Sequence, residues 1–230
     1  MMSQTRSLKE CKTLTKHIKG IRMLISITKR PFIWRSLYKI TLPSLMLAFS
    51  PSAFAGEIVT QIDVATVSKS RSTPLKLYLT PLEAHQALTD NPDILYVDVR
   101  DPIEINFIGH AAGMDKIIPL RLTTIELSAK RGAYKMIDNP TYVAEILALI
   151  KNKDLSKTDP IFLSCRSGVR SAVAARMLIA QGYTNVWNLV EGFEGSKNMH
   201  GARNKNGWRN AGLPWSYKLT PETAWTPLAK

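Results

Sequence analysis

Cysteine is scarce in this chain of 230 residues, in which only Cys11 and Cys165 occur. Histidine is scarce as well. His85 and His200 lie far apart in the sequence with no second ligand nearby, so we predict no metal site, and we expect no cofactor. The sequence has no internal repeats and no low-complexity tracts, which excludes a repeat architecture. Apolar residues make up 45% of the chain, a proportion typical of a globular protein.

Long hydrophobic runs are also lacking, because the best candidate falls short of the roughly 20 residues that span a bilayer. This candidate, residues 40–55, is interrupted by Pro43 and Ser44. It follows a long basic stretch and ends in small residues with an A-x-A cleavage pattern at 53–55. We therefore predict that residues 1–55 are an export signal cleaved after Ala55 and that the protein is periplasmic. An uncleaved segment that anchors the protein in the inner membrane is the alternative.

The formal net charge of +13 is concentrated in the same segment. Ten of the 31 basic and one of the 18 acidic residues lie in residues 1–55, which leaves a basic surplus of only four in residues 56–230. Since the basic stretch precedes the apolar run, we expect no nucleic-acid partner, and membrane contact only through an uncleaved N-terminal segment. A start at Met23 would not change this interpretation. Cleavage would remove Cys11, so Cys165 would have no partner for an internal disulfide.

Apolar runs alternate with helical patterns along the rest of the chain. The predicted strands lie in residues 76–80, 93–100, 159–165 and 184–193, and the predicted helices in residues 80–88, 139–152 and 171–182. The first helix has a capping-box pattern in Thr80 and Glu83. This alternation predicts an α/β domain with a mainly parallel central sheet flanked by helices. We expect a flexible lead-in over residues 56–74, the domain over 75–217 and a C-terminal tail over 218–230.

Cys165 ends an apolar strand and is followed by a tight loop and a helix that opens near Ser171. Ligands in open α/β sheets bind at this carboxyl end of the strands. The helix N-terminus and the cations of Arg166 and Arg170 favour a thiolate there. Gly168 lets the loop turn so that several backbone N–H groups converge on one anion. The alternative is a buried structural cysteine, which needs no cations beside it. We therefore predict that Cys165 is a nucleophile.

The stretch CRSGVRS at residues 165–171 resembles the active-site loop of the rhodanese-homology domain, a Cys-x-x-Gly-x-Arg loop. A second stretch, DVRDPIEINFIGHAAGMDKIIPL, resembles the D-x-R-x-x-x-E segment of this family, followed by G-H-x-x-G and a later Ile-Pro. The matching residues are Asp98, Arg100, Glu104, Gly109, His110, Gly113, Ile118 and Pro119. VEGFEG and NGWRNAGLPW are similar to the ends of many such domains. The resemblance covers roughly residues 75–217, although Ala111 stands where these domains often have isoleucine.

The resemblance implies a rhodanese-like fold and sulfurtransferase chemistry. Cys165 would accept sulfur from a small anionic donor such as thiosulfate and pass it, as a persulfide, to a thiol, to cyanide or to a client protein thiol. The residues implied in substrate binding are Arg166, Ser167, Gly168, Val169, Arg170 and Ser171. For Asp98 and Arg100 we favour an ion pair that fixes the loop to Glu104 over contact with substrate. His110 is interpreted as a hydrogen-bonded loop former.

Two alternative functions and one segment stay open. A cysteine phosphatase loop has five residues between cysteine and arginine, whereas four separate Cys165 from Arg170, and the smaller cradle suits sulfur better than phosphate. A sulfur carrier without turnover, or a partner-binding module, would keep the same loop, so the sequence does not separate it from an enzyme. Residues 120–139 exceed what a minimal domain needs; they either cover the site or form a partner surface.

Overall fold

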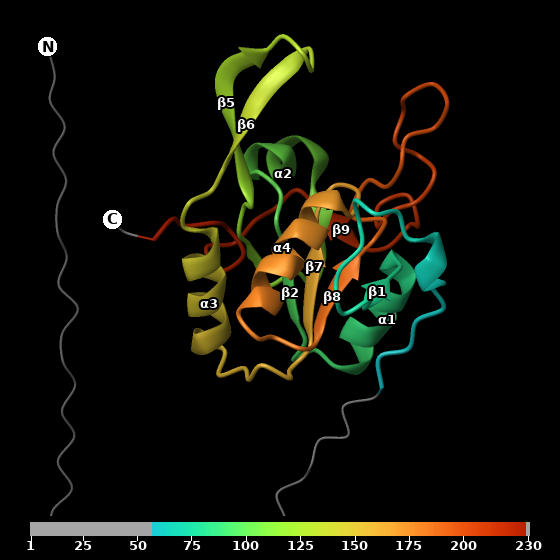
Figure 1. Ribbon diagram of the computed structural model, residues 1–230, viewed down its shortest axis with the longest axis vertical. Coiled ribbons are helices and arrows are strands. Elements are labelled where there is room, and N and C mark those ends of the chain that lie inside the picture. Colours follow the sequence, from blue (N-terminus) through green and yellow to red (C-terminus); the bar gives the residue numbers. More distant parts are fainter. Residues whose placement is uncertain (1–56, 229–230) are drawn as a thin grey trace, which may run out of the picture. The chain divides into compact units, whose positions relative to one another are not determined.

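A computed structural model of the chain describes residues 57–228, and the predicted export signal lies outside them. The fold is built on a five-stranded sheet in the order β1-β8-β7-β2-β4 (Figure 1). Its strands are β1 (Tyr78–Leu79), β2 (Leu95–Asp98), β4 (Lys116–Ile117), β7 (Ile161–Ser164) and β8 (Val186–Leu189). All four pairings in this sheet are parallel, which confirms the predicted α/β class.

Two pairs of helices cover the two faces of the sheet. They are α1 (Pro81–Asp90) and α2 (Pro102–Ile108) on one face, and α3 (Tyr142–Asn152) and α4 (Val169–Ala180) on the other. Side chains of a strand alternate between faces, so Leu163 of β7 packs with α3 and α4 while its neighbour Phe162 packs with α1 and α2. The central strands are buried on both faces, which explains their continuous apolar sequence.

Two of the helices begin in the same way. At α1 the Thr80 side chain and the Glu83 carboxylate form the predicted capping box. At α2, Asp101 and Glu104 form a second capping box, which also carries a proline at the first helical position. Helix α2 was not predicted from the sequence, although its capping pattern is the same as that of α1. Helix α4 begins at Val169, two residues earlier than the predicted opening near Ser171.

Smaller elements complete the domain. They are the 3-10 helix η1 (Val64–Thr66), the antiparallel pair β3 (His110–Ala111) and β9 (Trp215–Ser216), and the hairpin of β5 (Arg121–Ser128) and β6 (Ala133–Asp138). The His110 ring nitrogens lie 3.0 and 2.9 Å from the carbonyl oxygens of Ala111 and Lys218, which confirms its role as a loop former. Within residues 57–228 the longest helices are too short or too polar to cross a membrane.

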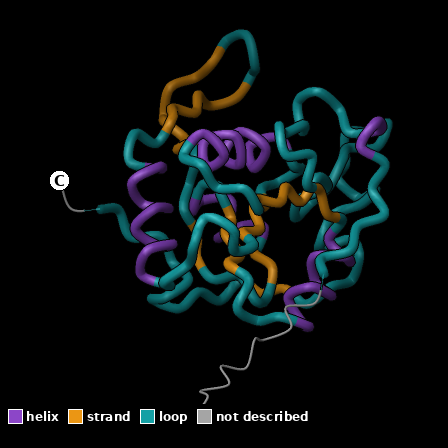
Figure 2. The backbone as a smooth tube through the Cα atoms, turned by 60° about the horizontal axis from the view of Figure 1, so that its bottom comes forward, coloured by secondary structure: helices purple, strands orange, loops and turns teal. Residues whose placement is uncertain are grey.

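The hairpin occupies the segment that exceeds a minimal domain, and it projects away from the layers (Figure 2). In contrast, the two ends of the described chain are tied to the domain. In the segment expected to be a flexible lead-in, the Gln61 N–H donates to the Glu83 carboxylate at 2.6 Å. Near the other end, Trp225 Nε1 donates to Glu145 Oε2 at 2.9 Å. Trp208 is fully buried.

Candidate active site

Cys165 lies directly after β7, at the carboxyl end of the central strands, and is the one cysteine within residues 57–228. Cys165 is only 1% exposed, and its sulfur accepts two hydrogen bonds from residues of the 165–171 loop. The Gly168 N–H donates at 3.2 Å and the Ser171 hydroxyl lies within donating distance at 3.4 Å. Since α4 begins at Val169, the positive end of its dipole also faces this region. The structure thus places the thiol where the sequence predicted it, at a strand-to-helix turn lined by hydrogen-bond donors.

Two glycines allow the loop to lie this close to the sheet. Gly168 has φ +87°, and a Cβ at this position would lie 2.2 Å from the carbonyl oxygen of Val190. Gly192 has φ +63°, and a Cβ there would lie 2.4 Å from the carbonyl oxygen of Cys165. Any residue other than glycine would have a strained backbone at these positions, and its Cβ would clash with the carbonyl oxygen. This arrangement of the loop therefore requires glycine at both positions.

Ser171 shares its single hydroxyl proton between two acceptors. Its oxygen lies 2.7 Å from Asn188 Oδ1 and 3.4 Å from the Cys165 sulfur. The Asn188 amide is oriented by its own donor group, which bonds to the carbonyl oxygens of Arg71 at 2.9 Å and Gly168 at 3.1 Å. A hydroxyl held in this way can turn its proton to the sulfur when the sulfur becomes charged.

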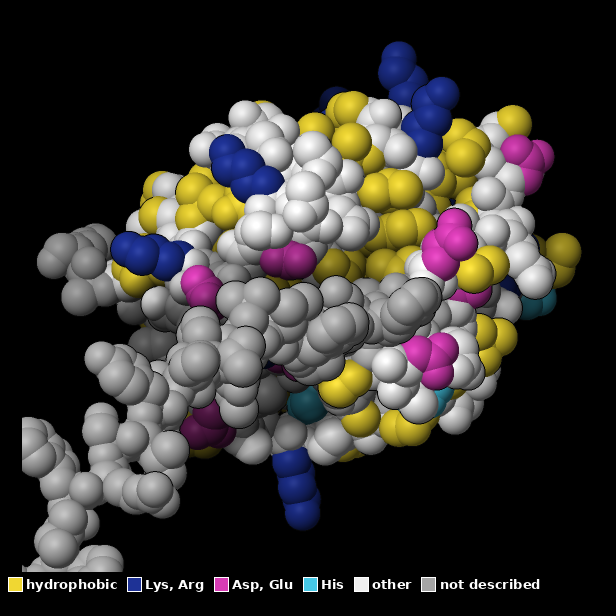
Figure 3. Space-filling model, turned by 90° about the horizontal axis from the view of Figure 1, so that it is seen from below, with side chains coloured by type: hydrophobic (Ala, Val, Ile, Leu, Met, Phe, Trp, Pro, Cys, Tyr) yellow, Lys and Arg dark blue, Asp and Glu magenta, His cyan; other side chains and the backbone are white. Residues whose placement is uncertain are grey.

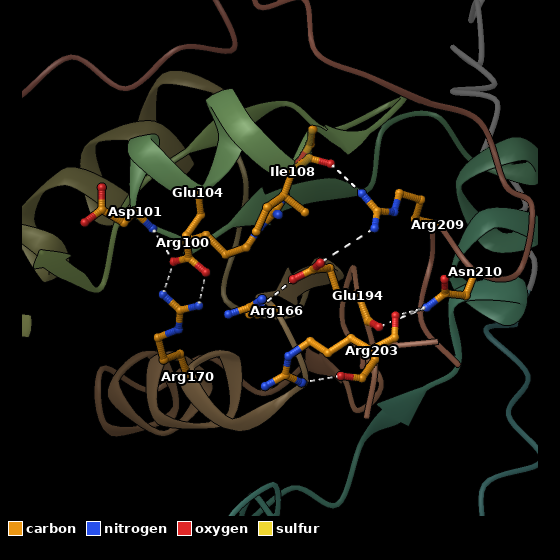
Figure 4. Close-up of polar contacts among 12 residues, drawn as sticks. Arg100, Asp101, Glu104, Ile108, Arg166, Arg170, Glu194, Arg203, Arg209 and Asn210 are labelled. Carbon is orange, nitrogen blue, oxygen red and sulfur yellow. Dashed lines mark hydrogen bonds and ion pairs between the residues drawn. The ribbon is translucent and has the colours of Figure 1, made fainter. Parts of the chain in front are cut away.

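Arg170 and Glu104 form a bidentate ion pair across the site, with distances of 2.5 and 2.8 Å (Figure 4). Burial alone would raise the pKa of the Glu104 carboxyl, but the hydrogen bonds and charge of Arg170 outweigh this and lower it. Burial alone would likewise lower the pKa of the Arg170 guanidinium, and its bonds to Glu104 raise it instead. Both groups are therefore charged at neutral pH. Glu104 does hold the loop, as expected, but through Arg170.

The ion pair expected of Asp98 and Arg100 forms, but it does not link the loop to Glu104. These two residues form a buried ion pair with each other, with Arg100 Nη2 2.6 Å from Asp98 Oδ2. Arg100 also donates to the Gly109 carbonyl at 2.9 Å and stacks over the Phe193 ring at 4.4 Å. Burial opposes the charge of Arg100, but the Asp98 carboxylate raises its pKa. The partners of Arg100 are therefore Asp98, the Gly109 carbonyl and the Phe193 ring, and neither residue of the pair forms a hydrogen bond with Glu104.

A second group of polar contacts, centred on Glu194, includes Arg166 of the active-site loop (Figure 4). Glu194 binds Arg166 and lies 3.7 Å from Arg209. Arg203 donates to the Gly195 carbonyl at 2.5 Å. Burial and the repulsion from Arg166 lower the pKa of Arg203. The arginines around the thiol are thus held in place by carboxylates and carbonyls, and the sequence did not indicate Glu194 or Arg203.

The lead-in also reaches the loop. Arg71 Nε donates to the Ser167 carbonyl at 2.8 Å, and its Nη2 lies 3.2 Å from the Ser196 hydroxyl. No motif pointed to Arg71, because it precedes the domain expected from residue 75. The Arg71 backbone carbonyl also accepts a hydrogen bond from the Asn188 amide, so the lead-in helps to orient the Asn188 side chain that bonds to Ser171.

An open pocket of about 450 Å³ gives access to Cys165. The predicted residues Arg166, Ser167, Val169 and Arg170 line it, whereas Gly168 and Ser171 contact the sulfur instead. The other lining residues are Glu104, Arg121, Thr123, Arg131, Ala133, Tyr134, Met136 and Arg203, most of them from the β5–β6 hairpin.

The pocket lining carries five arginines and one carboxylate. The face at the other end of the domain differs, because there charged side chains of both signs are scattered among apolar ones (Figure 3). A pocket in which one sign dominates concentrates ligands of the opposite charge. The arrangement is therefore suited to an anionic substrate that approaches a nucleophilic sulfur.

Comparisons with known proteins identify the family of this chain. Residues 80–199 match the model of the rhodanese-like domain, and they include Glu104 and the whole 165–171 loop. An uncharacterized protein, RP600, from Rickettsia prowazekii is 30% identical over 137 residues, which are 59% of this chain and 93% of that protein. Thiosulfate sulfurtransferase 16, chloroplastic, from Arabidopsis thaliana is 29% identical over 119 residues, 52% of this chain and 77% of that protein.

Among solved structures, Rv0390 from M. tuberculosis is 31% identical to this chain. The two superpose with a TM-score of 0.48, covering 61% of this chain and 97% of that one. The family match takes in more than half of the 230 residues and contains both motifs described above. The chain belongs to the rhodanese-like domain family.

Proposed function

We propose that this protein is a sulfurtransferase that moves sulfane sulfur from a donor such as thiosulfate to a thiol or cyanide through a persulfide on Cys165. The family supports sulfur transfer in general, and a relative named as a thiosulfate sulfurtransferase matches more than half of the chain. The reaction requires a sulfur nucleophile, an anion-binding approach and donors for a charged intermediate.

The first half-reaction is a displacement at sulfur. The Cys165 thiolate attacks the outer sulfur of thiosulfate, a new S–S bond forms, and the bond to the sulfonate sulfur breaks with its electron pair, so that sulfite leaves. The product is a cysteine persulfide anion. In the second half-reaction cyanide or a thiolate attacks the outer sulfur of the persulfide, and the Cys165 thiolate is released. Oxidation and reduction balance within each step.

One observation supports the proposal most strongly. The sulfur of Cys165 meets the Gly168 N–H at 3.2 Å and the Ser171 hydroxyl at 3.4 Å, and Cys165 lines a pocket to which five arginines contribute. A buried structural cysteine would require neither the donors nor the cations. Charge-assisted hydrogen bonds to sulfur would stabilise both the thiolate and the persulfide.

The test is intact-mass spectrometry of the protein before and after incubation with thiosulfate, with Cys165→Ser as the control. We expect the gain of one sulfur atom in the wild type and none in the variant. Added cyanide should remove that sulfur as thiocyanate over many cycles. A wild-type protein whose mass stays unchanged with thiosulfate would contradict the proposal.

A sulfur carrier without turnover is the second candidate. It is favoured by the hairpin beside the pocket, which a small-molecule enzyme does not require. A carrier would gain one sulfur but transfer it to cyanide slowly or only once. Thiocyanate produced in large molar excess over protein would exclude this candidate.

We further propose that the protein is exported to the periplasm and cleaved after Ala55. This rests on the basic stretch, the short apolar run and the A-x-A pattern of the sequence. The mature mass should then correspond to a chain that begins at Gly56. A full-length protein recovered in the membrane fraction would favour the anchored alternative.

A further inference from the structure

The β5–β6 hairpin borders the active site without belonging to the sheet that carries it. It forms a sheet of two strands, and its side chains line the same pocket as Cys165. Its lining residues run from Arg121 at its base to Arg131 near its tip, so the hairpin extends along the pocket. In Figure 1 it rises from the end of the domain at which β7 leads into α4.

Large apolar side chains are exposed on this hairpin. Ile125 is 95% exposed, Leu127 67% and Tyr134 60%. Leu127 and Tyr134 are paired across the two strands, so their side chains lie on the same face. Tyr134 lines the pocket, and this face therefore continues from the pocket outward. Exposed apolar residues beside a site mark a surface that contacts another molecule.

The hairpin and the pocket share a positive charge. Within residues 121–138 the basic residues outnumber the acidic ones four to two. Both acidic residues are already paired, Asp138 with Arg121 and Glu126 with Lys135. Arg131 and Lys130 remain beside the exposed apolar residues near the tip. A second copy of this chain fits poorly, because residues 56–230 carry a basic surplus. A partner with an acidic surface complements this region.

The pocket is also larger than a small sulfur donor requires. Its volume of about 450 Å³ lies in the range of about 300–1,000 Å³ that holds drug-sized molecules. A small anion such as thiosulfate would occupy only the part next to Cys165. The remaining length, which the hairpin borders, can hold a chain segment on either side of a reacting thiol.

We propose that the β5–β6 hairpin is a docking arm for an acidic protein, which presents a cysteine on an extended segment to Cys165. The transfer step rests on the sulfurtransferase function proposed above; the docking itself does not. Exposed apolar residues of the hairpin contact the partner, and the arginines of the pocket attract acidic residues next to its thiol. The sulfur then passes from the Cys165 persulfide to that thiol.

The test uses the full chain with Cys11→Ser, so that Cys165 is its single thiol. Two synthetic peptides of equal length and equal apolar content serve as acceptors, with one cysteine flanked either by glutamates or by lysines. The docking variant is Ile125→Glu with Leu127→Glu. The matched control is Val59→Glu with Leu82→Glu, which also replaces two exposed apolar residues but lies outside the hairpin. Transfer from thiosulfate-loaded protein is followed by mass spectrometry, with cyanide as the small acceptor.

We expect the glutamate peptide to accept sulfur about tenfold faster than the lysine peptide, and high salt to reduce this difference. The docking variant should lose most of that preference, whereas its rate with cyanide should equal that of the wild type. The control variant should match the wild type with all acceptors. An unchanged cyanide rate also shows that the variants are folded.

Equal rates for the two peptides, or equal behaviour of the docking and control variants, would overturn the proposal. A second outcome would also overturn it: the wild type forms a dimer in sedimentation analysis, the docking variant is a monomer, and both peptides accept sulfur at the same rate. If thiosulfate does not load Cys165, the proposed function fails, and docking is judged separately. Fluorescence anisotropy then measures the affinity of the labelled peptides for the unloaded protein. Docking predicts that the wild type and the control variant bind the glutamate peptide more tightly than the lysine peptide, and that the docking variant does not.

Discussion

The active-site loop and the β5–β6 hairpin border the same pocket but are held in place differently. The loop, residues 165–171, is bonded to the strands and helices around it through Glu104, Asn188 and the Phe193 backbone. The hairpin is bonded to the domain near its base, where the Thr123 N–H donates to Asp101 Oδ2 at 2.5 Å. Beyond that point its own strand pairing holds it, and its apolar side chains are exposed.

This difference separates two requirements of a transfer reaction. Donors aimed at a charged sulfur must be fixed in advance, since reorganising them would add to the barrier. A surface that receives a partner can tolerate movement and exposure, and loops and arms on a rigid framework commonly have this role. We therefore expect changes in the loop to affect folding and chemistry, and changes in the hairpin to affect affinity.

The largest difference in stability and activity between the two regions should come from alanine substitution of two glycines with positive φ, one in each region. Gly168→Ala places a Cβ 2.2 Å from the Val190 carbonyl oxygen, whereas Gly132→Ala in the hairpin turn meets no atom within 4 Å. We expect Gly168→Ala to cost about 3 kcal/mol or more of unfolding free energy and to abolish thiocyanate formation. Gly132→Ala should cost only about 1 kcal/mol and keep the activity. Urea unfolding measures both, and equal costs would remove the distinction between the regions.

Ion pairs give the next comparison. Glu104→Gln leaves Arg170 largely buried without its carboxylate, and we expect a loss of about 2 kcal/mol at pH 7. Glu126→Gln breaks an exposed hairpin pair with Lys135 and should cost less than about 0.5 kcal/mol. Thermal or urea unfolding of the two variants tests this. Similar losses would show that the hairpin pair is held as firmly as the pair in the site.

The pH dependence of the same variant gives an independent check. Arg170 lowers the pKa of Glu104 in the folded protein below its usual value of 4.5, although burial opposes this. A carboxyl with a lowered folded pKa stabilises the protein fully above its unfolded pKa and loses this effect as the pH falls through the folded pKa. The stability difference between wild type and Glu104→Gln should therefore be constant near neutrality and shrink below about pH 4.5. A difference that grows on acidification would contradict the assignment.

Ser171 probes the chemistry of the loop with less effect on folding. Ser171→Ala removes the hydroxyl that lies 3.4 Å from the Cys165 sulfur and 2.7 Å from Asn188 Oδ1. Loss of one hydrogen bond to a charged sulfur should slow persulfide formation about tenfold. Rapid-quench mass spectrometry with thiosulfate measures this step. Thr124→Ala, which removes an exposed hydroxyl of the hairpin, is the matched control, and a rate loss as large as that of Ser171→Ala would contradict the role of Ser171.

The sequence predicted the parallel sheet because its central strands are short, continuous apolar runs followed by charge. It predicted α1 from the capping box at Thr80 and Glu83, but α2 was missed although Asp101 and Glu104 repeat that pattern. Only seven residues long, α2 offers little helical periodicity to detect. The hairpin could not be derived either, since most of its residues are exposed and its strands lack the run of buried apolar side chains that marked the strands of the central sheet.

The candidate site was predicted where its residues are contiguous, in the 165–171 loop. The partners of its arginines come from distant parts of the chain, and local patterns carry no signal for such pairing. Glu194 reaches Arg166 from beyond β8, and Arg71 reaches the loop from the lead-in. The pairing of Glu104 with Arg170 was missed for the same reason, whereas Asp98 pairs locally with Arg100.

The smallest expected effect lies at the edge of the pocket, on the hairpin. Arg131 lines the pocket, whereas its neighbour Lys130 does not, so the two cations form a matched pair for substitution by glutamine. Arg131→Gln should raise the KM for thiosulfate about threefold at low salt and leave kcat unchanged, because it weakens attraction of the anion without touching the sulfur. Lys130→Gln should change neither constant, and the difference should vanish at high ionic strength. A fall in kcat for Arg131→Gln would mean that the hairpin takes part in the chemistry, and the separation between a catalytic loop and a recognition arm would then have to be abandoned.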